Sequence, residues 1–192
     1  MHQVYVNAFH SQEPSPPEGA TAILAIATDG SGGTAVARGA EKLAGWGWTA
    51  RHLAEPDPQL AATADESLAN TPGQEHHMEY GRVVTSPAQP EFIGANVHTN
   101  NTAELTAVHH ALKRVPDIVL HNETVFVLFD SALAINTTIG AWAARKHKAL
   151  VRRNREAHAS LKRAGIRVHF MHIRAHRGHY MNERADRLAM QE

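Results

Sequence analysis

The chain has 192 residues with 19 Lys/Arg and 19 Asp/Glu, so its net charge attracts no particular class of partner. It contains no cysteine, which excludes a disulfide framework and thiolate metal sites. No apolar run approaches the ~20 residues of a membrane span, and the first residues lack the pattern of a signal peptide. We expect a cytoplasmic protein without a membrane partner, and a monomer.

Proline and glycine divide the first half of the chain into short segments. Residues 1–20 are predicted to be an extension, with a short strand at Val4–Phe9 and a proline-rich linker at Ser11–Gly19. Four strands are predicted after it, at Thr21–Gly30, Gly45–Ala54, Met78–Ser86 and Pro90–His98. Because these segments follow one another with turn signals between them, we expect an antiparallel start to a sheet.

In the second half, helical and strand patterns alternate. Residues 101–115 carry Leu105, Val108, Leu112 and Val115 on a 3–4 spacing, which predicts an amphipathic helix. The remaining elements are a strand at Thr124–Ser131, helix over 132–164 with a break near 144–150, a strand at Ile166–Ile173 and a helix from Asn182. This order predicts an α/β fold, with a mixed central sheet (antiparallel N-terminal strands, then parallel strands) and helices packed on it.

Charge is unevenly distributed along the chain. Residues 41–104 hold nine acids against three Lys/Arg, whereas residues 142–177 hold eleven Lys/Arg against one acid. A solvated helix face would explain the basic region, and so would a surface for the phosphates of a nucleic acid. We expect one domain over 21–192, with an acidic insertion at about 55–90.

Four carboxylates lie at the ends of predicted elements: Asp29, Glu104, Asp130 and Asp186. Ligands in α/β sheets gather at strand ends and helix N-termini, so these side chains can converge. Oxygen ligands without cysteine suit Mg²⁺ or Mn²⁺, and two such ions can activate water against a phosphodiester.

Each of these carboxylates also has a structural explanation. Asp29 begins an Asp-Gly turn signal, and Asp130 before a serine could be a turn or cap acid. Glu104 would stand at the third helical position if Asn101 capped the helix, forming a capping box. Asp186 could pair with an arginine on the same helix.

Taken together, four blocks resemble the type 1 ribonuclease H family. They are TDGS (Thr28–Ser31), TNNTAEL (Thr99–Leu105), LFDS (Leu128–Ser131) and HRGHYMNERADRLA (His176–Ala189). The resemblance implies an RNase H-like fold and an endonuclease that cuts the RNA strand of RNA–DNA hybrids and leaves 5′-phosphates. It implies that Asp29 bridges two Mg²⁺ ions, that Glu104 and Asp130 complete one site and Asp186 the other, and that His176 assists proton transfer or product release.

The resemblance also implies a set of nucleic-acid contacts: Ser31, Thr99, Asn100, Asn101, Arg174, Asn182 and Glu183. Two departures from the family pattern are visible. The Asn-Pro-Gly that usually follows the first strand is missing, and the space between Asp130 and His176 is too short for a complete basic, Trp-containing handle. The stretch 144–155 supplies basic residues but could be a helix junction only.

Three alternatives therefore stay open. One is a nuclease of the same fold with another nucleic-acid substrate, and another is a non-catalytic module that binds hybrids. A third is a metal-binding protein that uses its histidines. Adjacent pairs such as His76–His77 and His109–His110 are poor chelators, because neighbouring side chains point to different faces of a helix or strand.

Overall fold

The computed structural model describes residues 22–32, 43–53, 76–121, 123–174 and 178–191. Within them one five-stranded sheet has the order β3-β2-β1-β4-β5. Its strands are β1 (Ala22–Ser31), β2 (Gly45–Leu53), β3 (His76–Arg82), β4 (Glu123–Phe129) and β5 (Val168–His172). β2 pairs antiparallel with β1 and β3, whereas β4 pairs parallel with β1 and β5. The expected mixed sheet is thus confirmed.

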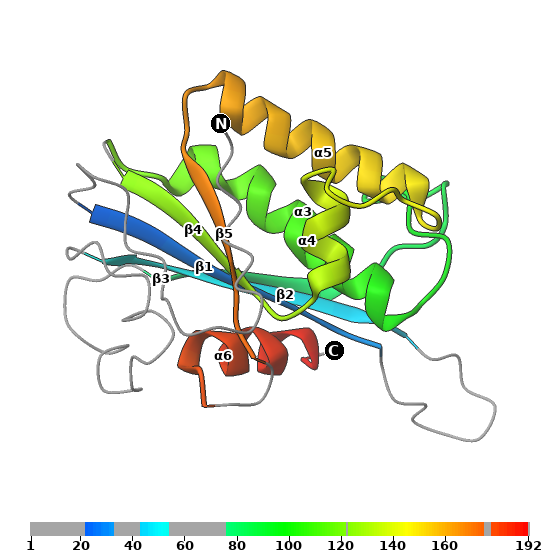
Figure 1. The fold of residues 1–192 in the computed structure, drawn as a ribbon. Coiled ribbons are helices and arrows are strands. Elements are labelled where there is room, and N and C mark those ends of the chain that lie inside the picture. The colour runs from blue at the N-terminus through cyan, green and yellow to red at the C-terminus, as the bar shows by residue number, and fades with distance from the viewer. Residues whose placement is uncertain (1–21, 33–42, 54–75, 122, 175–177, 192) are drawn as a thin grey trace.

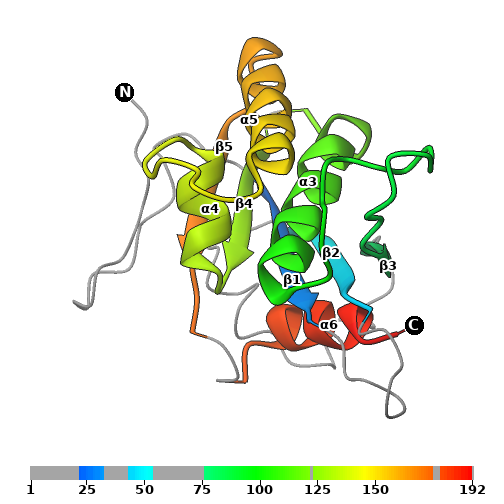
Figure 2. The ribbon, with the colours of Figure 1, turned by 90° about the vertical axis from the view of Figure 1, so that its right-hand side faces the viewer.

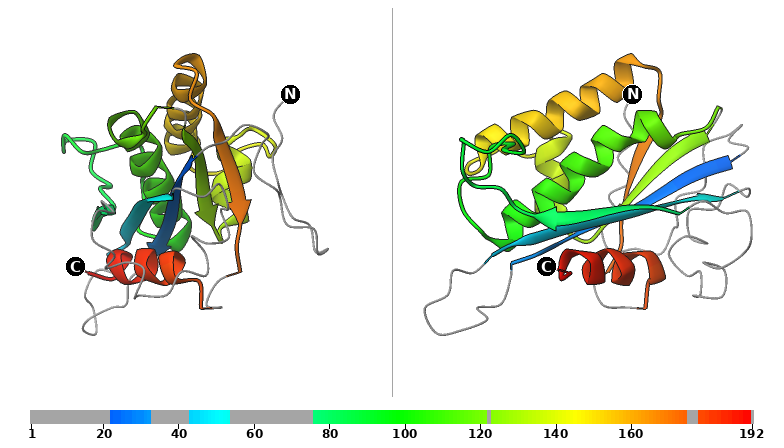
Figure 3. Two further views of the ribbon diagram at one scale, coloured as in Figure 1. Left: turned by 90° about the vertical axis from the view of Figure 1, so that its left-hand side faces the viewer. Right: turned by 180° about the vertical axis from the view of Figure 1, so that it is seen from behind.

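Among the described residues, four helices cover the two faces of this sheet unequally, as Figures 1 and 2 show. The helices α3 (Asn100–Ile118), α4 (Ala132–Thr138) and α5 (Lys148–Arg163) pack on one face. The opposite face is covered by α6 (Tyr180–Ala189), as the view from behind in Figure 3 shows. None of the described helices is both long and apolar enough to cross a membrane. The expected monomer and cytoplasmic location stay predictions.

β1 is buried on both faces because alternate residues serve different layers. Leu24 and Ile26 pack with the three-helix layer, whereas Ile23, Ala25 and Ala27 pack with the α6 layer. A strand covered on both sides is apolar throughout, as a central strand must be. On α3, the four apolar residues of the predicted stripe are all buried, so this helix prediction is confirmed.

Two element predictions were wrong. Pro90–His98 forms turns and irregular chain, because Gly94 adopts a left-handed φ of 106° and passes close to the backbone of Leu150 in α5. The link between α4 and α5 spans residues 139–147 and therefore starts earlier than predicted. Gly140, with φ 86°, follows the helix end and takes the conformation that commonly terminates helices.

The expected domain boundaries lie largely outside the described residues. This holds for the whole 1–20 extension and for the first part of the expected insertion at 55–90. Within that insertion, β3 is described and forms an edge of the sheet. The expectation of a single domain over 21–192 stays a prediction.

Candidate active site

The parallel pairing of β1 with β4 brings two of the carboxylates together. In this pairing Ala27 lies opposite Leu128. Continuing the same register by two residues sets Asp29 opposite Asp130, which follows the last residue of β4. Both carboxylates therefore lie at the carboxyl ends of adjacent parallel strands, where α/β sheets place their ligands.

The third carboxylate comes from α3, which lies across this end of the sheet. Thr99 caps the helix: its Oγ1 accepts from Thr102 N at 3.2 Å, and Thr102 Oγ1 accepts from Thr99 N at 3.0 Å. A Cβ on Gly30 would collide with the backbone nitrogen of Glu104. The absence of a side chain at Gly30 therefore lets the start of α3 lie directly on β1.

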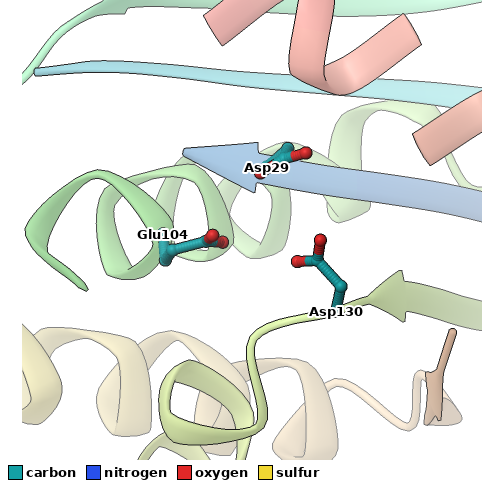
Figure 4. Close-up of side chains that lie close together, drawn as sticks. All are labelled: Asp29, Glu104 and Asp130. Atoms are coloured by element: carbon teal, nitrogen blue, oxygen red, sulfur yellow. The ribbon is translucent and has the colours of Figure 1, made fainter. Parts of the chain in front are cut away.

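Asp29, Glu104 and Asp130 form a compact cluster, shown in Figure 4. Ligand oxygens of the three side chains all lie within 4.8 Å of one another. Asp29 is 6% exposed and Glu104 5% exposed, whereas Asp130 is half-buried. The cluster thus has two buried members and one side that is open to solvent.

Burial and mutual repulsion dominate the electrostatics of the cluster. The pKa of Asp29 is raised to about 7, first by burial and then by the charge of Asp130. Burial also raises the pKa of Glu104 well above its ordinary value, and the charge of Asp29 raises it further. Hydrogen bonding between these two side chains adds to the rise in the pKa of Glu104 and acts in the opposite direction on Asp29.

This donor set fits a divalent cation. It offers carboxylate oxygens, which hard cations such as Mg²⁺ and Mn²⁺ prefer. Without a cation, the close approach of three carboxylates favours protonation of at least one of them, as the raised pKa values of Asp29 and Glu104 indicate. A bound cation would remove that repulsion.

Asp186 lies near this cluster but comes from the opposite face of the sheet. It is half-buried on α6, and its charge raises the pKa of both Asp29 and Glu104. The approach of α6 to the sheet depends on Gly47, whose missing Cβ would meet the backbone of Ala185 at 2.7 Å. Gly47 pairs with Asp29 in the sheet, so α6 packs directly beside the cluster.

The structural explanations for three of the carboxylates do not hold. Asp29 and Gly30 lie inside β1 and form no turn. Glu104 lies beyond the capping box, because Thr99 rather than Asn101 caps α3 and Thr102 is the third helical residue. The hydroxyl of Ser131 caps α4 by accepting from Ala134 N at 3.3 Å, so the carboxylate of Asp130 is not needed for that cap.

The residues expected to contact nucleic acid are spread around the same end of the sheet. Thr99, Asn100, Asn101, Arg174 and Glu183 are exposed, and Ser31 is half-buried at the end of β1. The side chain of Asn100 lies beside the cluster, with Nδ2 3.5 Å from Glu104 Oε1.

Two of the expected site residues differ from the exposed ones. Asn182 is 2% exposed, and among the described residues its Oδ1 has no hydrogen-bond partner, so its side chain packs inside the protein. His176 lies outside the described residues, as do its two neighbours in the chain.

His172 is a residue near the site that the sequence did not point to. Its Nε2 lies 3.2 Å from the backbone oxygen of Asp130, and since a carbonyl only accepts, the ring must donate. The ring also packs edge-on against Phe129. The alternation of side chains along β5 could have predicted which face of the sheet His172 lies on. It could not have predicted the contact with Asp130.

Residues 58–192 match the family model for RNase H. A ribonuclease H from Aromatoleum aromaticum is 32% identical to this chain over 141 residues, which cover 68% of this chain and 88% of that protein. This chain belongs to the RNase H family. The resemblance carried by the four blocks is thereby confirmed.

Solved RNase H structures support the same fold. The solution structure of the PFV RNase H domain is 17% identical with a TM-score of 0.55, covering 88% of this chain and 93% of that one. LC9-RNase H1, described as a type 1 RNase H with the type 2 active-site motif, is 19% identical with a TM-score of 0.52. The match covers 93% of this chain and 72% of LC9-RNase H1.

Proposed function

We propose that this chain is a metal-dependent endoribonuclease that hydrolyses the RNA strand of RNA–DNA hybrids and leaves 5′-phosphates. The observation that carries the proposal is the cluster of Asp29, Glu104 and Asp130, two of them buried, at the end of the sheet in an RNase H family fold. Family membership supports the class of activity, and the cluster supports the presence of catalytic machinery.

Asp29, Glu104 and Asp130 would hold one Mg²⁺, and Asp29 with Asp186 a second; Mn²⁺ would substitute. When bound, such ions lower the pKa of the attacking water and stabilise the charge that develops on the leaving oxygen. The protein's part is to hold the carboxylates in place. Burial of Asp29 and Glu104 keeps water away and so strengthens their attraction for a cation.

The N-terminus of α3 would bind the backbone of the hybrid beside this cluster. Thr99, Asn100 and Asn101 are exposed there, at the helix end that favours phosphate groups. Amide side chains can also test for the 2′-hydroxyl that distinguishes RNA from DNA. Ser31, Arg174 and Glu183 would add contacts, and His176 would transfer protons. We propose no direct contact for buried Asn182.

The test is cleavage of an end-labelled RNA–DNA hybrid by the purified chain with Mg²⁺, Mn²⁺ or EDTA. Single-stranded RNA, double-stranded RNA and double-stranded DNA serve as competing substrates. We expect metal-dependent cutting of the RNA strand of the hybrid, and at least a ~100-fold loss in Asp130→Asn, because removing one transition-state contact costs that much. Asp117→Asn, which changes an exposed acid at the far end of α3, should cut normally.

Each other outcome rejects a specific part of the proposal. Cutting of another substrate in place of the hybrid would reject the substrate class. Hybrid binding without cutting would leave a non-catalytic module. An equal loss of cleavage in Asp117→Asn and Asp130→Asn would show that the carboxylate cluster is not the catalytic site.

A further inference from the structure

A groove between α3 and α5 lies away from the carboxylate cluster. His109, Lys113 and Pro116 line it from α3, and Arg153, Ser160 and Arg163 line it from α5. Its volume is about 310 Å³. Figures 2 and 3 show these two helices side by side on the face opposite α6. Lys113 is nine residues beyond Glu104 on the same helix, ~13 Å along its axis, so the groove is separate from the cluster.

The walls of this groove carry an excess of positive charge. Lys113, Arg153 and Arg163 are exposed, and no described carboxylate forms an ion pair with them. The acid among the described lining residues, Glu156, lies 3.8 Å from Arg152, which is outside the groove. The groove is therefore lined by three cations and one acid, Glu156, an excess of positive charge.

Helix stability does not account for all three cations. Arg163 lies in the last turn of α5, where a cation offsets the negative end of the helix dipole. Lys113 and Arg153, however, lie inside their helices, more than one turn from either end. A solvated helix face would explain exposed cations, and a bound anion would also explain why they lie on opposite walls of one groove.

The floor of the groove offers hydrogen-bond acceptors. Asn154 Nδ2 donates to Leu105 O at 2.9 Å, which turns Asn154 Oδ1 toward His109 Nδ1 at 3.2 Å. The Nδ1 of His109 therefore carries the proton, and its Nε2 is an acceptor. Burial lowers the pKa of His109 to about 4, and the charges of Arg153 and Lys113 contribute to this, so the ring is neutral near pH 7.

Pro116 removes the usual helical donor to one carbonyl of α3. Proline has no backbone N–H, so it cannot donate the helical hydrogen bond that the carbonyl of Leu112 would otherwise accept. Leu112 also lines the groove. Three cations together with the neutral ring of His109 among the lining residues match a ligand that combines an anionic group with hydroxyl donors.

We propose that this groove binds the phosphate group of a nucleotide, either free or within a single nucleic-acid strand. Arginine and lysine from two helices can clamp a phosphate, and the hydroxyl of Ser160 can donate to it. His109 and Leu112 can accept from sugar hydroxyls. The volume is at the lower end of the ~300–1,000 Å³ of small-ligand pockets, which suits one nucleotide.

The test is an amide NMR titration of the full chain in EDTA at constant ionic strength. The probes are inorganic phosphate, 5′-AMP and a short single-stranded oligodeoxythymidylate. We expect saturable shifts at Lys113, Ala157 and Ser160. A variant with Lys113→Gln, Arg153→Gln and Arg163→Gln should bind about tenfold more weakly or worse, because charge-assisted hydrogen bonds are lost. All three positions are exposed, so this variant should fold, and its far-UV spectrum checks that.

The charge-matched control carries Arg145→Gln, Lys146→Gln and Lys148→Gln, three exposed cations outside the groove. If the groove variant loses binding of phosphate or AMP and the control keeps it, the result supports a free nucleotide as the ligand. The same result with the oligonucleotide alone supports a strand. Unchanged binding in the groove variant, equal loss in both variants, or shifts confined to the carboxylate cluster would overturn the proposal. Because EDTA removes divalent ions, the result does not depend on hybrid cleavage.

Discussion

Replacement of Asp29 by asparagine should stabilise the metal-free protein at neutral pH, although it should abolish cleavage. Asp29 is buried beside two other carboxylates, and these surroundings raise its pKa from 3.8 to about 7. Between these values the folded state binds more protons than the unfolded state does. The free energy of unfolding therefore falls as the pH rises from about 4 to about 7, and the loss persists above that range.

The size of this effect follows from the shift of the pKa. One pKa unit corresponds to about 1.4 kcal/mol, so the shift of Asp29 amounts to about 4 kcal/mol above pH 7. Asparagine keeps an oxygen that can accept from Gly30 N, as Asp29 Oδ1 does at 2.7 Å. Burying the amide group of asparagine offsets about 1–3 kcal/mol of the stabilisation that comes from removing the carboxylate. We expect a net stabilisation of about 1–3 kcal/mol at about pH 8, and less at about pH 5.

The measurement is urea unfolding of both proteins in EDTA at the two pH values. The control is Asp117→Asn, an exposed acid paired with Arg114, which should change stability by less than about 1 kcal/mol. Saturating Mg²⁺ should raise the stability of the native chain, by about 2.7 kcal/mol at 100 times the Kd, and should do little for Asp29→Asn. An Asp29→Asn variant less stable than the native chain at pH 8 in EDTA would refute the reasoning.

Three further substitutions test contacts that hold the sheet and helices together, each by urea unfolding. Gly30→Ala should lower the free energy of unfolding by about 3 kcal/mol or more and reduce cleavage, because the new Cβ collides with the backbone of α3. The control is Gly140→Ala, at a position with φ 86° and open space, which should lower it by about 1–2 kcal/mol. Equal losses of stability would contradict the close approach. Asn154→Ala should cost about 2–3 kcal/mol, because it breaks buried hydrogen bonds between α5 and α3, and an effect below ~0.5 kcal/mol would show that they contribute little. Glu123→Gln should lower the free energy of unfolding by about 1–2 kcal/mol. One carboxylate oxygen accepts from His52 Nδ1 and the other from Leu120 N, whereas glutamine has a single side-chain oxygen. An unchanged urea midpoint would show that these two hydrogen bonds contribute little.

The convergence of Asp29 with Asp130 could be predicted from the sequence because it depends on strand ends. Each acid follows an apolar run, and parallel strands end at the same edge of a sheet. Glu104 could be predicted from the start of an amphipathic helix. All three predictions use local patterns, whose period of two or 3.6 residues is visible in one sequence.

The position of Asp186 needs information that local patterns lack. Its helix is amphipathic, but the pattern does not say which face of the sheet the helix covers. The structure sets α6 against Gly47 of β2, on the face opposite α3, so the cluster and Asp186 approach each other around the end of β1. That choice depends on which sheet residues are small enough to admit a helix, which is a property of the assembled sheet.

The same limit explains why the strand at Pro90–His98 was predicted wrongly. The segment has apolar residues at strand-like spacing, but a strand needs a partner with free backbone groups. The chain instead turns at Gly94 and passes close to α5, where Ala95 is buried. A pattern of apolar residues records burial, and here the burial is against a helix rather than within a sheet.

Gly30 shows why one dipeptide admitted two interpretations. Asp-Gly is a turn signal when the glycine supplies a left-handed φ. Gly30 lies in β1 and has no positive φ, so its backbone conformation does not require glycine. The glycine is required instead because α3 lies against its α-carbon. Asp29 and Gly30 thus have different roles in one strand: the carboxylate joins the cluster, and the missing side chain admits the helix that carries Glu104. If Gly30→Ala folded stably but lost cleavage, it would show that this close approach sets the carboxylate geometry rather than the fold.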